Sequence, residues 1–107
     1  MTRCVARVRR PGASAPEFEG SDEPVIWFTS IASLAAVLSE DNRTLLRTIS
    51  SHHPKSITEL AALTGRKVSN LSRTLKMMAG YGLVKLNRNM KELEPIALAT
   101  RFLVILE

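Results

Sequence analysis

The chain has 107 residues, of which 45% are hydrophobic and 23% charged, and its formal net charge is +5. This length supports one domain with a single modest core. Its longest apolar run, FLVIL at 102–106, is far too short to cross a bilayer. A single cysteine, Cys4, excludes an internal disulfide, and the basic start MTRCVARVRRP lacks the apolar segment of a signal peptide. We therefore expect a cytoplasmic protein that does not enter a membrane.

The positive charge is concentrated in the middle of the chain. Residues 42–91 contain ten Lys and Arg residues and one acid, Glu59, whereas residues 1–41 contain four basic and six acidic residues. The last sixteen residues contain one basic residue and three acids. A concentrated basic field is typical of proteins that bind polyanions, although solvated cationic faces are common in small basic proteins. Charge alone leaves both interpretations open.

The first 24 residues have the composition of an arm. They contain three of the five prolines, two of the five glycines and four acids. We expect residues 1–24 to form an N-terminal arm that is flexible or docks against a dimer partner, and residues 25–107 to form the folded domain. Weak alternation of Cys4, Ala6 and Val8 is compatible with a short strand in the arm, and the apolar run VIWF at 25–28 is suited to anchoring it.

Helical spacing of apolar residues begins near residue 30. Thr29 or Ser30 suits the N-cap of this first helix. Its apolar positions are Ile31, Leu34, Ala35 and Leu38.

A second helix is predicted after Ser39. Glu40 and Asp41 favour the positive N-terminal end of this helix. Its expected buried stripe consists of Leu45, Leu46 and Ile49. Because proline disfavours helix in the residue before it, Pro54 leads us to expect an end before Ser51.

A short third helix is predicted in SITELAALTG at 56–65. Ser56 and Glu59 fit a capping box, Thr58 is a second candidate N-cap, and the sequence does not decide between them. Gly65 is typical of the residue that ends a helix. The residues expected to face inward are Ile57, Leu60 and Ala61.

A fourth helix is predicted from about Val68 to Ala79, closed by Gly80 and Gly82. On a helical wheel of about 100° per residue, one apolar stripe contains Val68, Leu71, Leu75 and Met78. The opposite face contains Ser69, Arg73 and Lys76, with Asn70 at its edge. These are side chains suited to base edges, and no acid occurs from residue 60 through 91 to repel phosphate. Contact with nucleic acid is therefore favoured over a plain solvated face.

The rest of the chain predicts strands. VKL at 84–86 is expected to enter a hairpin with NRNMKE at its tip, and Pro95 is expected to break the return strand. RFLVIL at 101–106 is dense in β-branched and aromatic residues and predicts a final strand.

The segment ITELAALTGRKVSNLSRTLKMMAGYGLVKL at 57–86 resembles the helix-turn-helix and adjoining wing of winged-helix transcriptional regulators of the MarR and ArsR type. The matching pieces are ELA at 59–61, Gly65, SRTLK at 72–76 and GLV at 82–84. The broad match covers about residues 30–95. WF at 27–28 and NRTLLR at 42–47 also resemble a narrower group of small DNA-binding regulators that includes antitoxins.

The resemblance implies a mainly α fold with a small β-hairpin wing, a winged helix-turn-helix in which the fourth helix enters the major groove. The residues implied to contact base edges are Ser69, Asn70 and Arg73. The residues implied to contact the DNA backbone are Thr58, Arg66, Lys67, Lys76, Lys85, Arg88 and Lys91. Two residues depart from the family pattern, since Arg66 replaces an apolar residue after the turn glycine and Lys67 replaces the usual Ser or Thr cap. They leave the start of the fourth helix open.

Catalytic and metal chemistry is not indicated. Adjacent histidines such as His52 and His53 point different ways, and no further ligand cluster accompanies them. Cys4 is a lone cysteine, no Ser/His/acid motif or Gly-rich phosphate loop occurs, and Met77 and Met78 are expected to pack in or near the core. We expect no cofactor, no metal and no enzymatic activity.

The leading hypothesis is a sequence-specific repressor that binds double-stranded DNA as a homodimer. The alternative is an antitoxin that binds a toxin protein and regulates its own operon. The candidate protein-binding surfaces are the arm, VIWF and RFLVIL, and RFLVIL could equally complete a sheet of its own chain.

Overall fold

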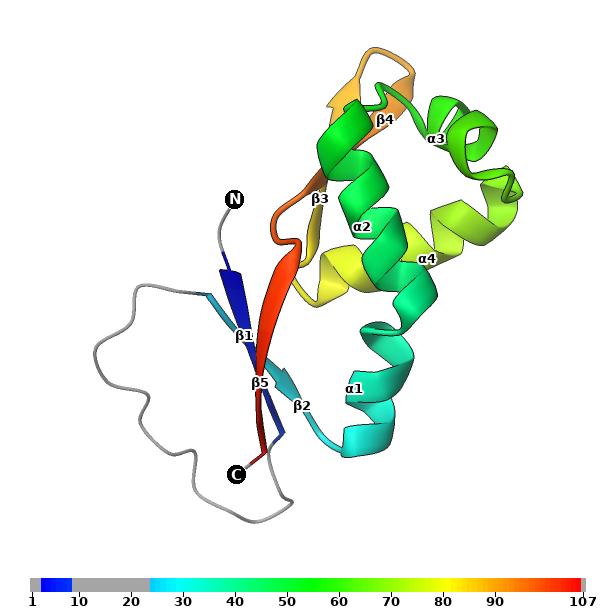
Figure 1. Ribbon diagram of the computed structural model, residues 1–107. Helices are drawn as coiled ribbons and strands as arrows, with labels where there is room; N and C mark the ends of the chain where they lie inside the picture. Colours follow the sequence, from blue (N-terminus) through cyan, green and yellow to red (C-terminus); the bar gives the residue numbers. More distant parts are fainter. Residues whose placement is uncertain (1–2, 9–23, 107) are drawn as a thin grey trace.

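The computed structural model describes residues 3–8 and 24–106, which form a small α/β domain with four helices and five strands (Figure 1). The helices are α1 (Ile31–Val37), α2 (Glu40–His52), α3 (Ile57–Thr64) and α4 (Val68–Gly80). The strands are β1 (Arg3–Val8), β2 (Val25–Phe28), β3 (Val84–Asn89), β4 (Glu92–Ala97) and β5 (Arg101–Leu106). Among the described residues, no helix combines the length and apolar character needed to cross a membrane.

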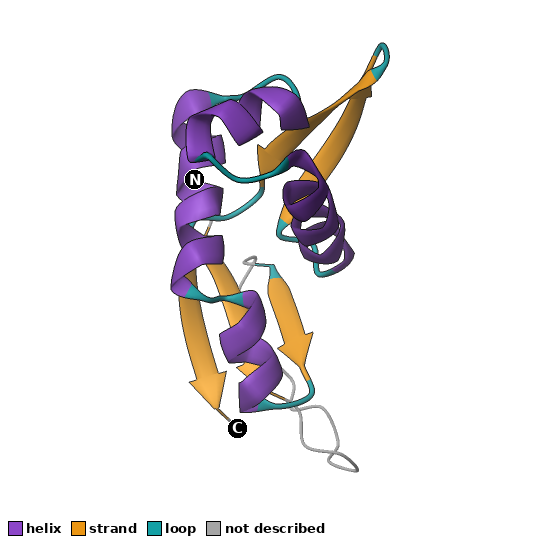
Figure 2. Ribbon diagram, turned by 90° about the vertical axis from the view of Figure 1, so that its right-hand side faces the viewer, coloured by secondary structure: helices purple, strands orange, loops and turns teal. Residues whose placement is uncertain are grey.

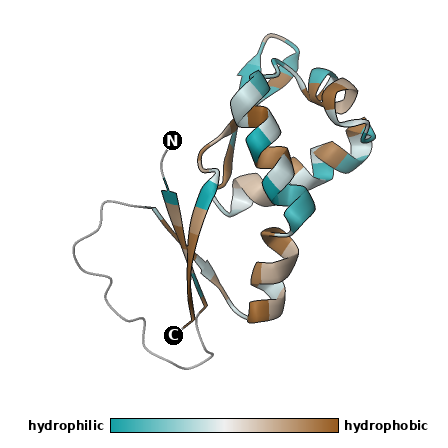
Figure 3. Cartoon of the chain, in the orientation of Figure 1, coloured by the Kyte–Doolittle hydropathy of each residue, from teal (hydrophilic) through white to brown (hydrophobic). Residues whose placement is uncertain are grey.

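A three-stranded parallel sheet is the largest departure from the expected mainly α fold. Its order is β2-β1-β5, with Val5 opposite Val25 on one side and Leu103 on the other. Figure 2 shows this sheet at one end of the molecule, and the hairpin lies at the other. Apolar residues dominate β1 and β5 in Figure 3.

The arm and the C-terminal strand therefore meet in this sheet. Residues 3–8 form its central strand, in which Cys4, Val5 and Ala6 are at most 1% exposed. A buried strand thus lies inside the segment expected to be an arm; residues 1–2 and 9–23 of that segment lie outside the described residues. The apolar C-terminus completes a sheet of its own chain, which is one of the two outcomes expected for RFLVIL.

One hydrophobic core connects the sheet to the helices. It joins Cys4, Ala6 and Phe28 of the sheet to apolar side chains of every helix and of the hairpin. The buried stripe of α2 consists of Leu45, Leu46 and Ile49, as predicted. In α1 the prediction is only partly right, because Leu38 is buried while Ile31 is 60% exposed.

Side chains and backbone close the helix ends. The hydroxyls of Ser30, Ser39 and Ser56 accept the N–H groups of Ser33, Asn42 and Glu59 at 3.0, 3.2 and 3.0 Å, so these serines are the N-caps. The prediction that α2 ends before Ser51 is wrong. The helix continues to His52 and ends there, because His53 adopts the left-handed conformation, with φ of 49°, and caps the helix with its N–H donated to the Ile49 carbonyl.

The second sheet is the antiparallel hairpin of β3 and β4. Pro95 does not break the return strand but lies within it, opposite Leu86. Both strands of a two-stranded sheet are edge strands, so a proline can be accommodated without removing a ladder hydrogen bond. Met90 and Lys91 form the tip, where Met90 is 91% exposed.

Candidate nucleic-acid interface

The pair α3 and α4, joined by a turn at 65–67, is the structural centre of the candidate site. Leu60 of α3 and Leu71 and Leu75 of α4 are fully buried, which fixes the two helices against each other. Gly65 ends α3 with φ of +74°, a conformation that L side chains rarely adopt. The α4 helix begins at Val68, with Lys67 as an N-cap that makes no side-chain capping bond. The sequence left the first residue of this helix undecided, and the structure places it at Val68.

The outward face of α4 is polar and cationic. Ser69, Asn70, Arg73 and Lys76 are all exposed, whereas Leu71, Leu75 and Met78 are buried. Val68 was expected in the buried stripe but is 45% exposed, because the packing of this helix starts one turn later, at Leu71. The first turn of α4 therefore lies outside the core and is exposed.

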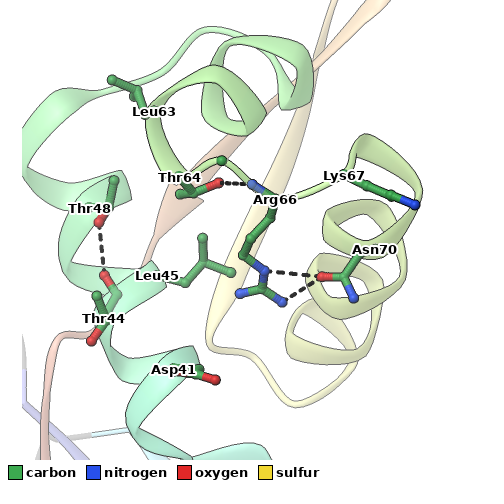
Figure 4. Close-up of a pocket in the computed structure, with 10 residues that line it drawn as sticks. Asp41, Thr44, Leu45, Thr48, Leu63, Thr64, Arg66, Lys67 and Asn70 are labelled. Carbon is green, nitrogen blue, oxygen red and sulfur yellow. Dashed lines mark hydrogen bonds between the residues drawn. The ribbon is translucent and has the colours of Figure 1, made fainter.

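Arg66 makes contacts that the sequence did not suggest. Its Nε and Nη2 donate to Asn70 Oδ1 at 3.0 and 2.7 Å (Figure 4). The same Nη2 also lies 3.4 Å from Thr74 Oγ1. Its backbone N–H donates to Thr64 Oγ1 at 3.3 Å, and that hydroxyl donates to the Leu60 carbonyl at 2.9 Å. The residue that departs from the family pattern is thus tied to both helices of the pair.

A groove lies beside this contact, between α2 and the start of α4 (Figure 4). Its α2 wall includes Asp41, Thr44 and Thr48, and its other wall includes Arg66 and Asn70. The acid-free surroundings inferred from the sequence hold along 60–91, but the fold brings Asp41 to the same groove. Sequence spacing could not have found this neighbour, because it comes from a different helix.

The remaining predicted backbone contacts are all exposed. Thr58 lies in the first turn of α3, Lys67 precedes α4, and Lys91 lies at the hairpin tip. Lys85 and Arg88 both lie on β3, three positions apart. Since side chains alternate along a strand, these two point to opposite faces of the hairpin. A ligand that contacts both side chains must therefore touch both faces of the hairpin.

The residues weighed for other chemistry lie in the core, against it, or at the end of α2. Cys4 is buried in β1, and Met78 is buried while Met77 packs against the core, as expected. His52 and His53 are exposed at the end of α2. In the described part of the chain, no group of three or more His, Cys, Asp or Glu side chains could hold a metal ion.

Comparison with known proteins gives two matches. A solved structure described as the predicted DNA-binding transcriptional regulator from E. coli is similar with a TM-score of 0.53 and 25% sequence identity. The similarity covers 63% of this chain and 72% of that one. No curated protein matches. The model of the HVO_A0114 family matches residues 37–103, which is more than half of the chain and runs from the end of α1 into β5. This chain therefore belongs to the HVO_A0114 family.

Proposed function

We propose that this protein is a transcriptional regulator that binds specific double-stranded DNA sequences and acts in the cytoplasm as a dimeric repressor. The observation that carries the proposal is the outward face of α4, which exposes Ser69, Arg73 and Lys76 with no acid along residues 60–91. The similarity to a protein described as a DNA-binding transcriptional regulator supports it. Because such regulators are not enzymes, that similarity also supports the expectation of a non-enzymatic protein.

In this proposal α3, the turn, α4 and the hairpin form a winged helix-turn-helix of the MarR and ArsR type. The N-terminal half of α4 enters the major groove and presents its side chains to base edges. Arg73 is suited to guanine O6 and N7, while Ser69 can donate to or accept from several bases. Thr58, Lys67 and Lys76 lie beside this face and contact phosphates, which supply affinity without sequence choice.

The hairpin acts as the wing. Lys85 and Arg88 lie on opposite faces of the ribbon, and Lys91 lies at its tip. A ribbon that enters a minor groove has a phosphate backbone on each side. The opposed cations therefore suit that position, each facing the phosphates of one strand.

A second candidate function, an antitoxin that binds a toxin protein, is favoured by the surface of β5. Leu103, Val104 and Leu106 are 38%, 45% and 54% exposed, and β5 is an edge strand of its sheet. Exposed apolar edge strands are sites where another chain pairs. In the leading proposal that chain is a second copy of this protein; in the alternative it is a toxin.

Selection from a pool of random duplexes tests the proposal. The purified chain should enrich one sequence, and a duplex of that sequence should compete at least about a thousandfold better than random DNA, the lower end of specific recognition. Light scattering on the complex should show two protein chains per duplex. Enrichment of no sequence would refute the proposal of a specific regulator, and one chain per duplex would refute the dimer.

A further inference from the structure

The contact between Arg66 and Asn70 bears on which base the protein recognises. Arg66 was expected to contact phosphate, as any exposed arginine beside a DNA-binding helix would. Instead the residue is half-buried, and its guanidinium donates twice to one oxygen of Asn70. These bonds use Nε and Nη2 and direct the guanidinium toward its own helix.

The chemistry fixes which way the Asn70 amide faces. A guanidinium has five donors and no acceptor, so only the amide oxygen can face it. A carbonyl oxygen has two lone pairs, and here both receive an N–H, at 3.0 and 2.7 Å. The Asn70 side chain therefore offers its NH2 group, with two donors and no remaining acceptor, to whatever approaches the exposed side of α4.

Arg66 is itself held in place from two sides. Its backbone N–H donates to Thr64 Oγ1 at the end of α3, and its Nη2 reaches Thr74 Oγ1 one helical turn beyond Asn70. The guanidinium therefore spans from the turn to the second turn of α4. This arrangement orients the Asn70 amide before any DNA binds, which reduces the conformational entropy lost there on binding.

We infer that Arg66 is a positioning residue that converts Asn70 into a donor-only contact for a base edge with acceptors, guanine above all. The inference rests on the proposed function. Asparagine usually pairs with adenine, whose N6 donates to the amide oxygen while N7 accepts from the amide nitrogen. Because the Asn70 oxygen is already occupied, only its NH2 group can face adenine. The N6 amino group of adenine is also a donor, so no hydrogen bond forms between them. Guanine presents two adjacent acceptors, O6 and N7, and cytosine presents only a donor.

The test replaces each base pair of the selected duplex in turn and compares four proteins: the unmodified chain, Asn70→Ala, Arg66→Met and Lys67→Met. At one base pair the unmodified chain should favour guanine over adenine by at least about fivefold, and Asn70→Ala should abolish that preference. Arg66→Met frees the amide oxygen, so adenine should rise to equal or exceed guanine at the same base pair. Circular dichroism checks that each variant folds, and Arg66→Leu, which also removes every donor, replaces Arg66→Met should the latter not fold.

Lys67→Met is the matched control, because it removes the neighbouring cation from the same turn. It should lower the slope of log affinity against log salt by about one and leave every base preference unchanged, whereas Arg66→Met should change the preference at that one base pair. If Arg66→Met instead behaves like Lys67→Met, Arg66 is a phosphate contact and the inference is overturned while the proposed function stands. An unchanged set of preferences in Asn70→Ala also overturns the inference. If the unmodified chain selects no sequence, the proposed function itself fails.

Discussion

The rings of Phe28 and Tyr81 stack with their centroids 5.0 Å apart and their planes 23° apart. Phe28 ends β2, and Tyr81 follows the last residue of α4. This contact joins the parallel sheet to the far end of the helix proposed to bind DNA. The sheet therefore helps to set how α4 is presented, although it contributes no residue to the candidate interface.

The coupling between these two rings is measurable. Phe28→Leu and Tyr81→Leu should each lower the free energy of unfolding, because each removes aromatic surface from the core. The double variant should lose less than the sum, with a coupling of about 0.5–1.5 kcal/mol. Urea denaturation of the four proteins gives this value. Additive losses would mean that the rings are adjacent without interacting.

The stability that the N-cap gives to α3 should depend on the hydroxyl of Ser56 and not on that of Thr58. Ser56→Ala removes the acceptor of the Glu59 N–H and should lower the free energy of unfolding by about 1 kcal/mol. Thr58→Ala, the other cap candidate from the sequence, is the control and should leave stability nearly unchanged because Thr58 is exposed within the helix. A larger loss in Thr58→Ala than in Ser56→Ala would contradict the cap assignment. Thermal unfolding followed by circular dichroism distinguishes the two.

Two glycines should respond in opposite directions to alanine. Gly65 has φ of +74°, so Gly65→Ala is strained and should cost about 1 kcal/mol of stability. Gly80 is the last residue of α4 and has open space around it, so Gly80→Ala should be neutral or raise stability by up to about 1 kcal/mol. Denaturation midpoints of both variants test this. Equal effects would mean that the turn after α3 does not require the left-handed conformation.

The hairpin cations should contribute affinity without sequence choice. Lys85→Ala and Arg88→Ala should each weaken binding to specific and random duplexes alike and lower the salt slope by about one. A change in only one of the two hairpin variants would mean that one face of the ribbon alone contacts DNA.

The helices could be predicted from the sequence because their signals are local. Ser39 with Glu40 and Asp41, and Ser56 with Glu59, mark the starts of α2 and α3, and Gly65 marks an end. The stripe of α4 was predictable from Leu71 onwards for the same reason. The end of α2 was missed because a left-handed His53 is a rare conformation that no local pattern announces.

What could not be predicted depends on contacts between distant segments. The parallel pairing of Cys4 with Phe102 joins the two ends of the chain, and no periodicity within either segment specifies the partner. The contact between Arg66 and Asn70 could not be predicted for a different reason. Asn70 was placed on the polar side of a helical wheel and Arg66 was assigned to the DNA backbone by resemblance, and only the path of the turn shows that the arginine reaches the asparagine.

Arg73→Ala tests the central claim most directly, because Arg73 is the exposed arginine at the middle of the outward face of α4. Its affinity for the selected duplex and for random DNA should be measured by titration at two salt concentrations. We predict a loss of about 1–3 kcal/mol on the selected duplex, a much smaller loss on random DNA, and relaxed preference at one base pair. Equal losses on both duplexes would contradict base recognition by α4.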